Sequence, residues 1–237
     1  MDFHALPTRL GPAVILIGIL ASTGGCSTTQ ARPNWMRNMV FWEDRESDPR
    51  FKGPTPAEQI EQLREQIAAV PKMSADEQRT LAERLNEAFK NEADPLLRRE
   101  FVRVSSACAA PAAGETLTMA LADSESDVRE AACEAWARHG GPQAIPKLAD
   151  TMKRDAELNV RLAAVRGLAK IGGSDAITAV APALEDEKPA MQYRAVQALR
   201  EMTGKDFGDN ANAWREYLRG GSPPEISVVE RMKLQAF

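Results

Sequence analysis

The sequence predicts an all-α protein, a right-handed solenoid of about four helical hairpins with a capping helix at each end. Three observations support this fold class. Hydrophobic residues make up 43% of the chain and aromatic residues only 5%, a balance that suits helices packed through small side chains. Two helix-start motifs lie near residues 55 and 74. A pattern of apolar and charged positions then recurs every 31 or 32 residues.

Both helix-start motifs are capping boxes. "TPAE" begins at Thr55 and "SADE" begins at Ser74, and each places a glutamate at the third helical position, where it can bond back to the cap. Apolar residues follow each motif at helical spacing: Ile60, Leu63, Ile67 and Val70 after the first, and Leu81, Leu85 and Phe89 after the second. Pro71 separates the two predicted helices.

The repeat becomes visible when four segments are aligned. One apolar column holds Leu97, Val128, Val160 and Met191, spaced by 31, 32 and 31 residues. The next column holds Arg98, Arg129, Arg161 and Gln192, and an acidic column six residues earlier holds Glu92, Asp123, Asp155 and Asp186. A steady period over several columns indicates stacked repeats, because a single hairpin cannot bury its apolar face alone.

These columns resemble the HEAT repeats of short bacterial proteins, over residues 74–204. The resemblance implies two antiparallel helices per repeat, with the second helices lining a concave side. It also implies an aspartate–arginine ladder of structural role. We expect Asp123 to pair with Arg129 and Asp155 with Arg161, each acid bonding backbone amides at the next repeat's turn. In this alignment Gln192 occupies the position where the arginine partner of Asp186 should stand, so the ladder is predicted to end at the last repeat.

The stretch "NVRLAAVRGLAKIGG" from Asn159 to Gly173 shows how the repeats should pack. Ala163, Ala164 and Gly167 are small, so we expect neighbouring helices to converge on them. Gly172 and Gly173 should end the helix, since glycine readily adopts the left-handed conformation of a helix C-terminus.

The chain should divide into four parts. Residues 1–25 predict a lipoprotein signal peptide, residues 26–54 a flexible tether, residues 55–204 the solenoid with its N-terminal capping helix, and residues 205–237 a C-terminal capping helix and tail. We expect Asp209 to cap a short helix carrying Trp214, Tyr217 and Leu218. A cation loop at residues 206–212 is the alternative, but the spacing matches no calcium motif.

The N-terminus indicates export. The apolar run from Leu10 to Ala21 has the length of a signal-peptide core, and the glycines before Cys26 resemble a bacterial lipobox, although Thr23 stands where leucine is usual. We therefore expect a lipid on Cys26, with an ordinary secretory signal as the alternative. Ser27 favours the outer membrane, facing the periplasm. The cluster of Trp, Met and Phe at residues 35–42 could contact either the membrane or the first helices.

Candidate catalytic residues are few. Deoxyhypusine hydroxylases, which are HEAT-like, bind iron through repeated His–Glu pairs, and neither His4 nor His139 precedes a glutamate. We expect His139 at a helix C-terminus, where the dipole favours it, and we expect Cys108 and Cys133 to be free thiols. Triad, P-loop and dinucleotide motifs are missing. With a net charge of −4 and no long basic block, nucleic-acid binding is not expected.

What remains is a surface. Two rows point away from the apolar stripe of the second helices: Arg99, Glu130, Leu162 and Tyr193, and then Arg103, Glu134, Arg166 and Gln197. We expect these residues to bind a protein partner, with a merely solvated face as the alternative. The sequence thus predicts a lipid-anchored scaffold of the cell envelope with no enzymatic activity, metal, cofactor or small-molecule substrate. A HEAT-like lyase or chromophore-handling enzyme, related to the bilin lyases, and a purely structural envelope component are the alternatives.

Overall fold

The computed structural model describes residues 54–225. This part of the chain contains ten α-helices, two short 3-10 helices and no strand, so the predicted all-α solenoid is confirmed. The predicted signal peptide, the predicted lipid-attachment residue Cys26 and the Trp, Met and Phe cluster at residues 35–42 lie outside the described residues, as do tail residues 226–237.

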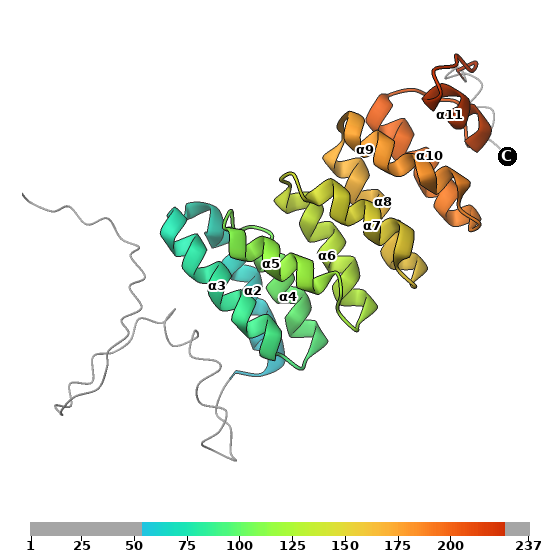
Figure 1. Cartoon of the computed structure of the whole chain (residues 1–237). Coiled ribbons are helices and arrows are strands. Elements are labelled where there is room, and N and C mark those ends of the chain that lie inside the picture. Colours follow the sequence, from blue (N-terminus) through green and yellow to red (C-terminus); the bar gives the residue numbers. More distant parts are fainter. Residues whose placement is uncertain (1–53, 226–237) are drawn as a thin grey trace, which may run out of the picture. The chain divides into compact units, whose positions relative to one another are not determined.

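Four helical hairpins follow one another along the chain (Figure 1). Helix α2 (Pro56–Ala69) and the 3-10 turn η1 (Val70–Lys72) come first. The hairpins are α3 (Ala75–Asn91) with α4 (Pro95–Ser105), α5 (Pro111–Ala120) with α6 (Ser126–His139), α7 (Ala144–Arg154) with α8 (Leu158–Ile171), and α9–η2 (Gly173–Val180, Ala181–Glu185) with α10 (Pro189–Thr203). Helix α11 (Ala211–Leu218) ends the series.

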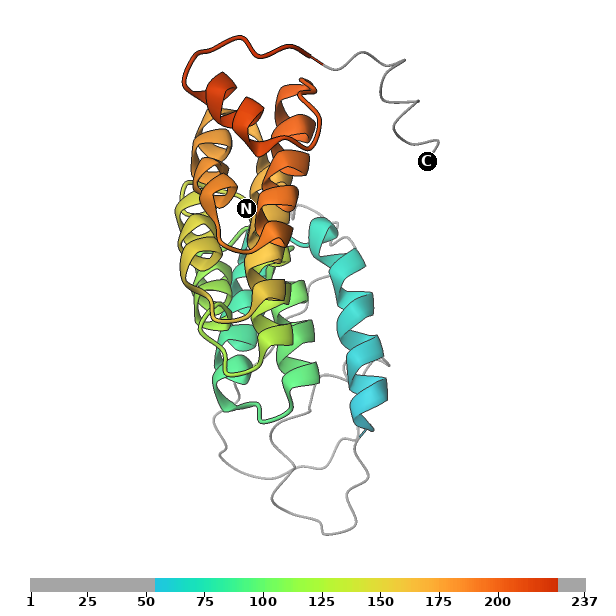
Figure 2. The ribbon, with the colours of Figure 1, turned by 90° about the vertical axis from the view of Figure 1, so that its right-hand side faces the viewer.

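The hairpins stack so that their helices form two layers (Figure 2). We call the first helix of each hairpin the A helix and the second the B helix. The B helices α4, α6, α8 and α10 pack against one another in that order, and each also packs on its own A helix. Helix α2 packs against α4, on the B-helix side of the array.

Both predicted capping boxes are present. The Thr55 hydroxyl accepts the Glu58 amide at 3.3 Å while the Glu58 carboxylate accepts the Thr55 amide at 2.8 Å. Ser74 and Glu77 repeat this exchange at the start of α3. Two amides that lack a partner within the helix are thereby bonded at each start, which explains why the helices begin at these residues.

The small residues of α8 lie where the helices approach closely, as predicted. Ala163 and Ala164 are fully buried. A Cβ atom on Gly167 would lie 3.0 Å from Leu148 Cδ1 and 3.2 Å from the Cys133 carbonyl oxygen, so the backbones of α6 and α8 approach more closely here than a side chain at this position would ordinarily permit. The helix ends at Gly172, whose φ of +70° is readily adopted by glycine.

The charged ladder exists, but its pairing differs from the prediction. The Asp123 carboxylate accepts two hydrogen bonds from Arg98 of the preceding repeat, at 2.7 and 2.8 Å. Asp155 likewise accepts two from Arg129, at 2.8 and 3.1 Å, and Arg161 pairs with Asp186. The predicted pairs Asp123 with Arg129 and Asp155 with Arg161 were therefore wrong. An arginine side chain is long enough to reach forward to the next turn.

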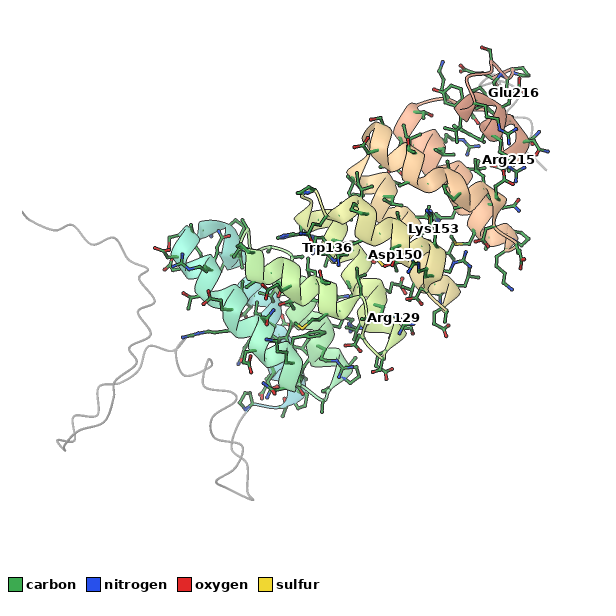
Figure 3. All side chains as sticks on the ribbon, in the orientation of Figure 1. Arg129, Trp136, Asp150, Lys153, Arg215 and Glu216 are labelled. Atoms are coloured by element: carbon green, nitrogen blue, oxygen red, sulfur yellow. The ribbon has the colours of Figure 1, made fainter. Side chains whose placement is uncertain are left out.

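Each ladder aspartate also holds its own turn together. Asp123 accepts the amide of the residue two places later at 3.0 Å, and Asp155 and Asp186 do the same at 2.9 Å. Arg129 (labelled in Figure 3) donates to the carbonyl oxygens of Asp123 and Ser124. The prediction that Asp186 has no cationic partner was wrong, because Arg161 pairs with it. Gln192 keeps only the turn contact, donating to the Asp186 carbonyl at 2.7 Å.

The C-terminal cap covers the last repeat. Trp214 of α11 is fully buried and packs edge-on against Phe207, with ring centroids 4.9 Å apart. The residue that caps α11 is Asn210, not the predicted Asp209, because the Asn210 side chain accepts the Asn212 amide. Asp209 instead pairs with Arg200 at 3.2 Å.

Candidate protein-binding face

The eight predicted face residues lie on the four B helices, and none of them is buried. We call this surface the B-helix face; its two rows are Arg99, Glu130, Leu162 and Tyr193, and Arg103, Glu134, Arg166 and Gln197. Each B helix contributes one residue to each row, because the helices stack in register and the two rows are four residues apart along each helix.

Most charges of the B-helix face already have partners within the protein. Arg166 donates to Glu130 across the α6–α8 contact at 2.7 Å. Arg103 donates to Glu100 at 2.6 Å. The uncharged Gln197 also has a partner within the protein, since it accepts a hydrogen bond from Arg200 at 3.0 Å. The face therefore offers less free charge to a partner than its sequence suggests. Glu134 is the exception, because it is an exposed acid with no ion pair among the described residues.

Tyr193 is the most exposed large hydrophobic side chain among the described residues. It is 54% exposed, and Leu96 follows at 47%. Leu162 stands in the same row on the neighbouring B helix and is partly exposed. Tyrosine is enriched among residues that dominate binding energy at protein interfaces. The α8–α10 part of the face thus combines an exposed aromatic side chain with a neighbouring arginine, Arg166, that is already paired with Glu130.

Sequence reasoning missed Glu100. This residue lies in α4 at the position where α6 has Ala131 and α8 has Ala163, and its side chain is fully buried. Lys and Glu are almost never fully buried unless paired. The same column holds Arg194 in the last repeat. A glutamate where the two middle repeats have alanine was the signal that could have identified Glu100, although the alignment alone does not show which element covers the residue.

His139 is the last residue of α6, as predicted, but burial rather than the helix dipole governs it. Its ring lies edge-on to Trp136 (labelled in Figure 3), with centroids 5.8 Å apart. Burial lowers the pKa of His139 despite hydrogen bonds with the backbone of Cys108 and Ser106. The imidazole therefore joins the end of α6 to the loop after α4 as a neutral group.

The two described cysteines are free, as predicted. Burial raises the pKa of the Cys108 thiol to about 11 and that of Cys133 to about 12. The thiolate is the nucleophilic form, so neither thiol is activated for covalent chemistry.

A surface hollow of about 390 Å³ lies at the turn edge beside the Arg161–Asp186 pair. Its lining carries Lys153 and Lys188 but also Glu185 and Glu187, and includes no histidine, cysteine or serine. Within residues 54–225 no group of three or more His, Cys, Asp or Glu side chains could hold a metal ion. No helix of that range is long and apolar enough to cross a membrane.

The repeat geometry agrees with comparison to known families. The model of HEAT repeats matches residues 82–163 and 147–213, which together span more than half of the 237 residues. The chain belongs to the HEAT-repeat proteins. The comparison with curated proteins found no match.

Several solved structures resemble the chain, including the following three. Human deoxyhypusine hydroxylase in complex with glycerol is 21% identical, with a TM-score of 0.47, and the match covers 52% of this chain and 44% of the hydroxylase. Less than half of the hydroxylase is therefore matched. One engineered protein is 20% identical with a TM-score of 0.42, and the match covers 71% of this chain and 81% of the engineered chain. A second engineered protein is 21% identical with a TM-score of 0.41, and the match covers 71% of this chain and 83% of that chain. The family assignment therefore rests on the repeat model.

Proposed function

We propose that this protein is a scaffold that binds a protein partner through the B-helix face. The observation that carries the proposal is the exposed Tyr193 in one row with the partly exposed Leu162, on two adjacent B helices, with Arg166 of the second row already paired with Glu130. An aromatic side chain held on a packed helix loses little conformational freedom on binding, so its burial contributes to affinity at small entropic cost.

The role we propose is binding rather than catalysis. His139 is engaged with backbone groups at a half-buried helix end, and the thiols of Cys108 and Cys133 are held protonated by burial. The proposal needs no metal, cofactor, nucleic acid or small-molecule substrate. HEAT repeats in general mediate protein–protein interaction, which supports this choice.

We further propose that the scaffold is exported and carried on a lipid at Cys26, on the periplasmic side of a bacterial outer membrane. The support is the sequence pattern of residues 10–27 alone. Residues 27–54 would then lie between the anchor and α2.

Affinity capture from detergent-solubilised membranes tests the binding proposal. The comparison is between wild type, the double variant Leu162→Asp/Tyr193→Ala, and the control Thr178→Asp, an exposed residue of A helix α9. We expect one or more proteins to be captured by wild type and the control and lost with the double variant. Capture that does not depend on the B-helix face would contradict the proposal and favour a purely structural role. A coloured or metal-bearing purified product would favour the enzyme class.

A further inference from the structure

Helix α2 is the most lightly embedded of the long helices. Only Leu63 among its 14 residues is buried, whereas α6 and α8 each bury six of 14. Its neighbours are α4 and the short turn η1. Segments with few buried apolar contacts open locally at low free-energy cost, so α2 should detach more readily than any repeat helix.

The surface that α2 covers contains Glu100. Three arginines surround one oxygen of this carboxylate: Arg103 lies 2.6 Å from Glu100 Oε1, Arg64 of α2 lies 3.6 Å away, and Arg99 lies 3.8 Å away. Arg64 is half exposed while Glu100 is fully buried. The contact between α2 and α4 therefore includes a charged cluster at the repeat position where α6 and α8 carry a buried alanine.

This cluster is incompletely bonded. Glu100 Oε2 and Arg99 Nε are both buried and have no hydrogen-bond partner. A buried polar atom without a partner destabilises the state that buries it. When α2 lifts away, water can reach both atoms, so their hydration offsets part of the apolar contact that is lost. Replacing a buried ion pair by apolar residues is often neutral or stabilising, and the glutamate thus favours opening.

We propose that α2 is an exchangeable lid over a second docking surface on α4. The surface accepts an amphipathic helix with α2's chemistry: apolar residues spaced like Ile60, Leu63 and Ile67, and a cation at the place of Arg64. Helix α2 is itself an example of a helix with these residues that packs on the surface of α4. A partner helix whose cation also reaches Glu100 Oε2 would bind more tightly than α2, which leaves that oxygen unbonded.

Hydrogen exchange of the wild-type protein tests whether α2 opens. We expect the amides of α2 to exchange at least about tenfold faster than those of α6 and α8, since each opens with its own free energy. Amides of α2 that are protected as strongly as those of α8 would overturn the lid, because the helix would then open only with the whole solenoid.

A labelled peptide of residues 55–72 tests whether the surface accepts a helix in trans. The receptor is the full chain carrying Leu63→Asp, which places a charge at the one buried residue of α2 and should therefore detach this helix, while the sequence of α4 is unchanged. We expect this receptor to bind the peptide at least about tenfold more tightly than wild type does, because the resident helix competes in wild type. A peptide with Arg64→Glu should bind at least about tenfold more weakly, since its charge repels Glu100.

The two docking surfaces can be separated in the same experiment. Adding Leu162→Asp/Tyr193→Ala to the receptor should leave peptide affinity unchanged, so failure of the lid and failure of the B-helix face are distinguishable. A Leu63→Asp receptor that keeps the far-ultraviolet circular dichroism of wild type and binds no peptide would overturn the proposal. If that variant does not fold, hydrogen exchange of the wild type decides.

Discussion

Arg98 and Asp123 form a nearly buried ion pair that joins two consecutive repeats. Two hydrogen bonds of 2.7 and 2.8 Å connect them, and their side chains are only 12% and 5% exposed. Bidentate pairs of this kind fix geometry as well as adding energy. The acid also accepts a backbone amide of its own turn, so one carboxylate links the stacking of repeats to the shape of the turn.

Asp155→Ala and Asp186→Ala should destabilise the protein by similar amounts, about 1–3 kcal/mol each. Each aspartate has an arginine from the preceding repeat and an amide of its own turn. Glu92→Ala is the control, because Glu92 bonds its own turn at 2.9 Å without an ion pair among the described residues, and it should cost less. Urea unfolding measures all three. A loss for Asp186→Ala as small as that of Glu92→Ala would contradict the forward pairing.

His139 should make the protein less stable as pH falls below about 6.5, the usual pKa of histidine. Burial lowers the folded-state pKa of His139. Between the two pKa values the unfolded chain binds more protons, so stability falls as pH falls through that window and is unaffected above it. His139→Gln should remove this part of the pH dependence. Unfolding free energies at several pH values test it, and an identical dependence in the variant would exclude His139 as its source.

Gly167→Leu should destabilise the protein by about 1–3 kcal/mol or more, because the packed contact cannot absorb added carbons. A Cβ there already meets Leu148 and the Cys133 carbonyl. Arg166→Ala should cost at most about 1 kcal/mol, since it removes only a partly exposed pair with Glu130. Thermal unfolding compares the two. A silent Gly167→Leu with a damaging Arg166→Ala would mean that α8 is rotated from this arrangement.

Cys26→Ala should release the protein from the membrane fraction or leave it unprocessed. The multiple acyl chains typical of such lipoproteins anchor firmly, whereas one chain binds only marginally. Fractionation of cells and mass spectrometry of the mature N-terminus make the measurement. A wild-type N-terminus without acyl groups would exclude the anchor and favour an ordinary secretory signal.

The repeat columns predict the helices because burial recurs with the stacking period. For the same reason, the sequence alone predicted that Gly167 lies at a close contact between helices. Column membership does not say which neighbouring turn a flexible arginine reaches, so the partner of Asp123 could not be predicted. Glu100 was missed because one of its contacts, Arg64, comes from α2, which lies outside the repeat alignment. The pairing of Arg166 with Glu130 likewise depends on the separation of two helices, which spacing alone leaves open.

Photo-cross-linking in cells tests the central claim, binding through the B-helix face, most directly. A photoreactive phenylalanine derivative replaces Tyr193 in one strain, Leu162 in a second, and Thr178 of the A-helix layer in a third. We predict that positions 193 and 162 form a covalent adduct with the same protein and that position 178 does not. The absence of any adduct from positions 193 and 162, or the same adducts from all three positions, would contradict the account.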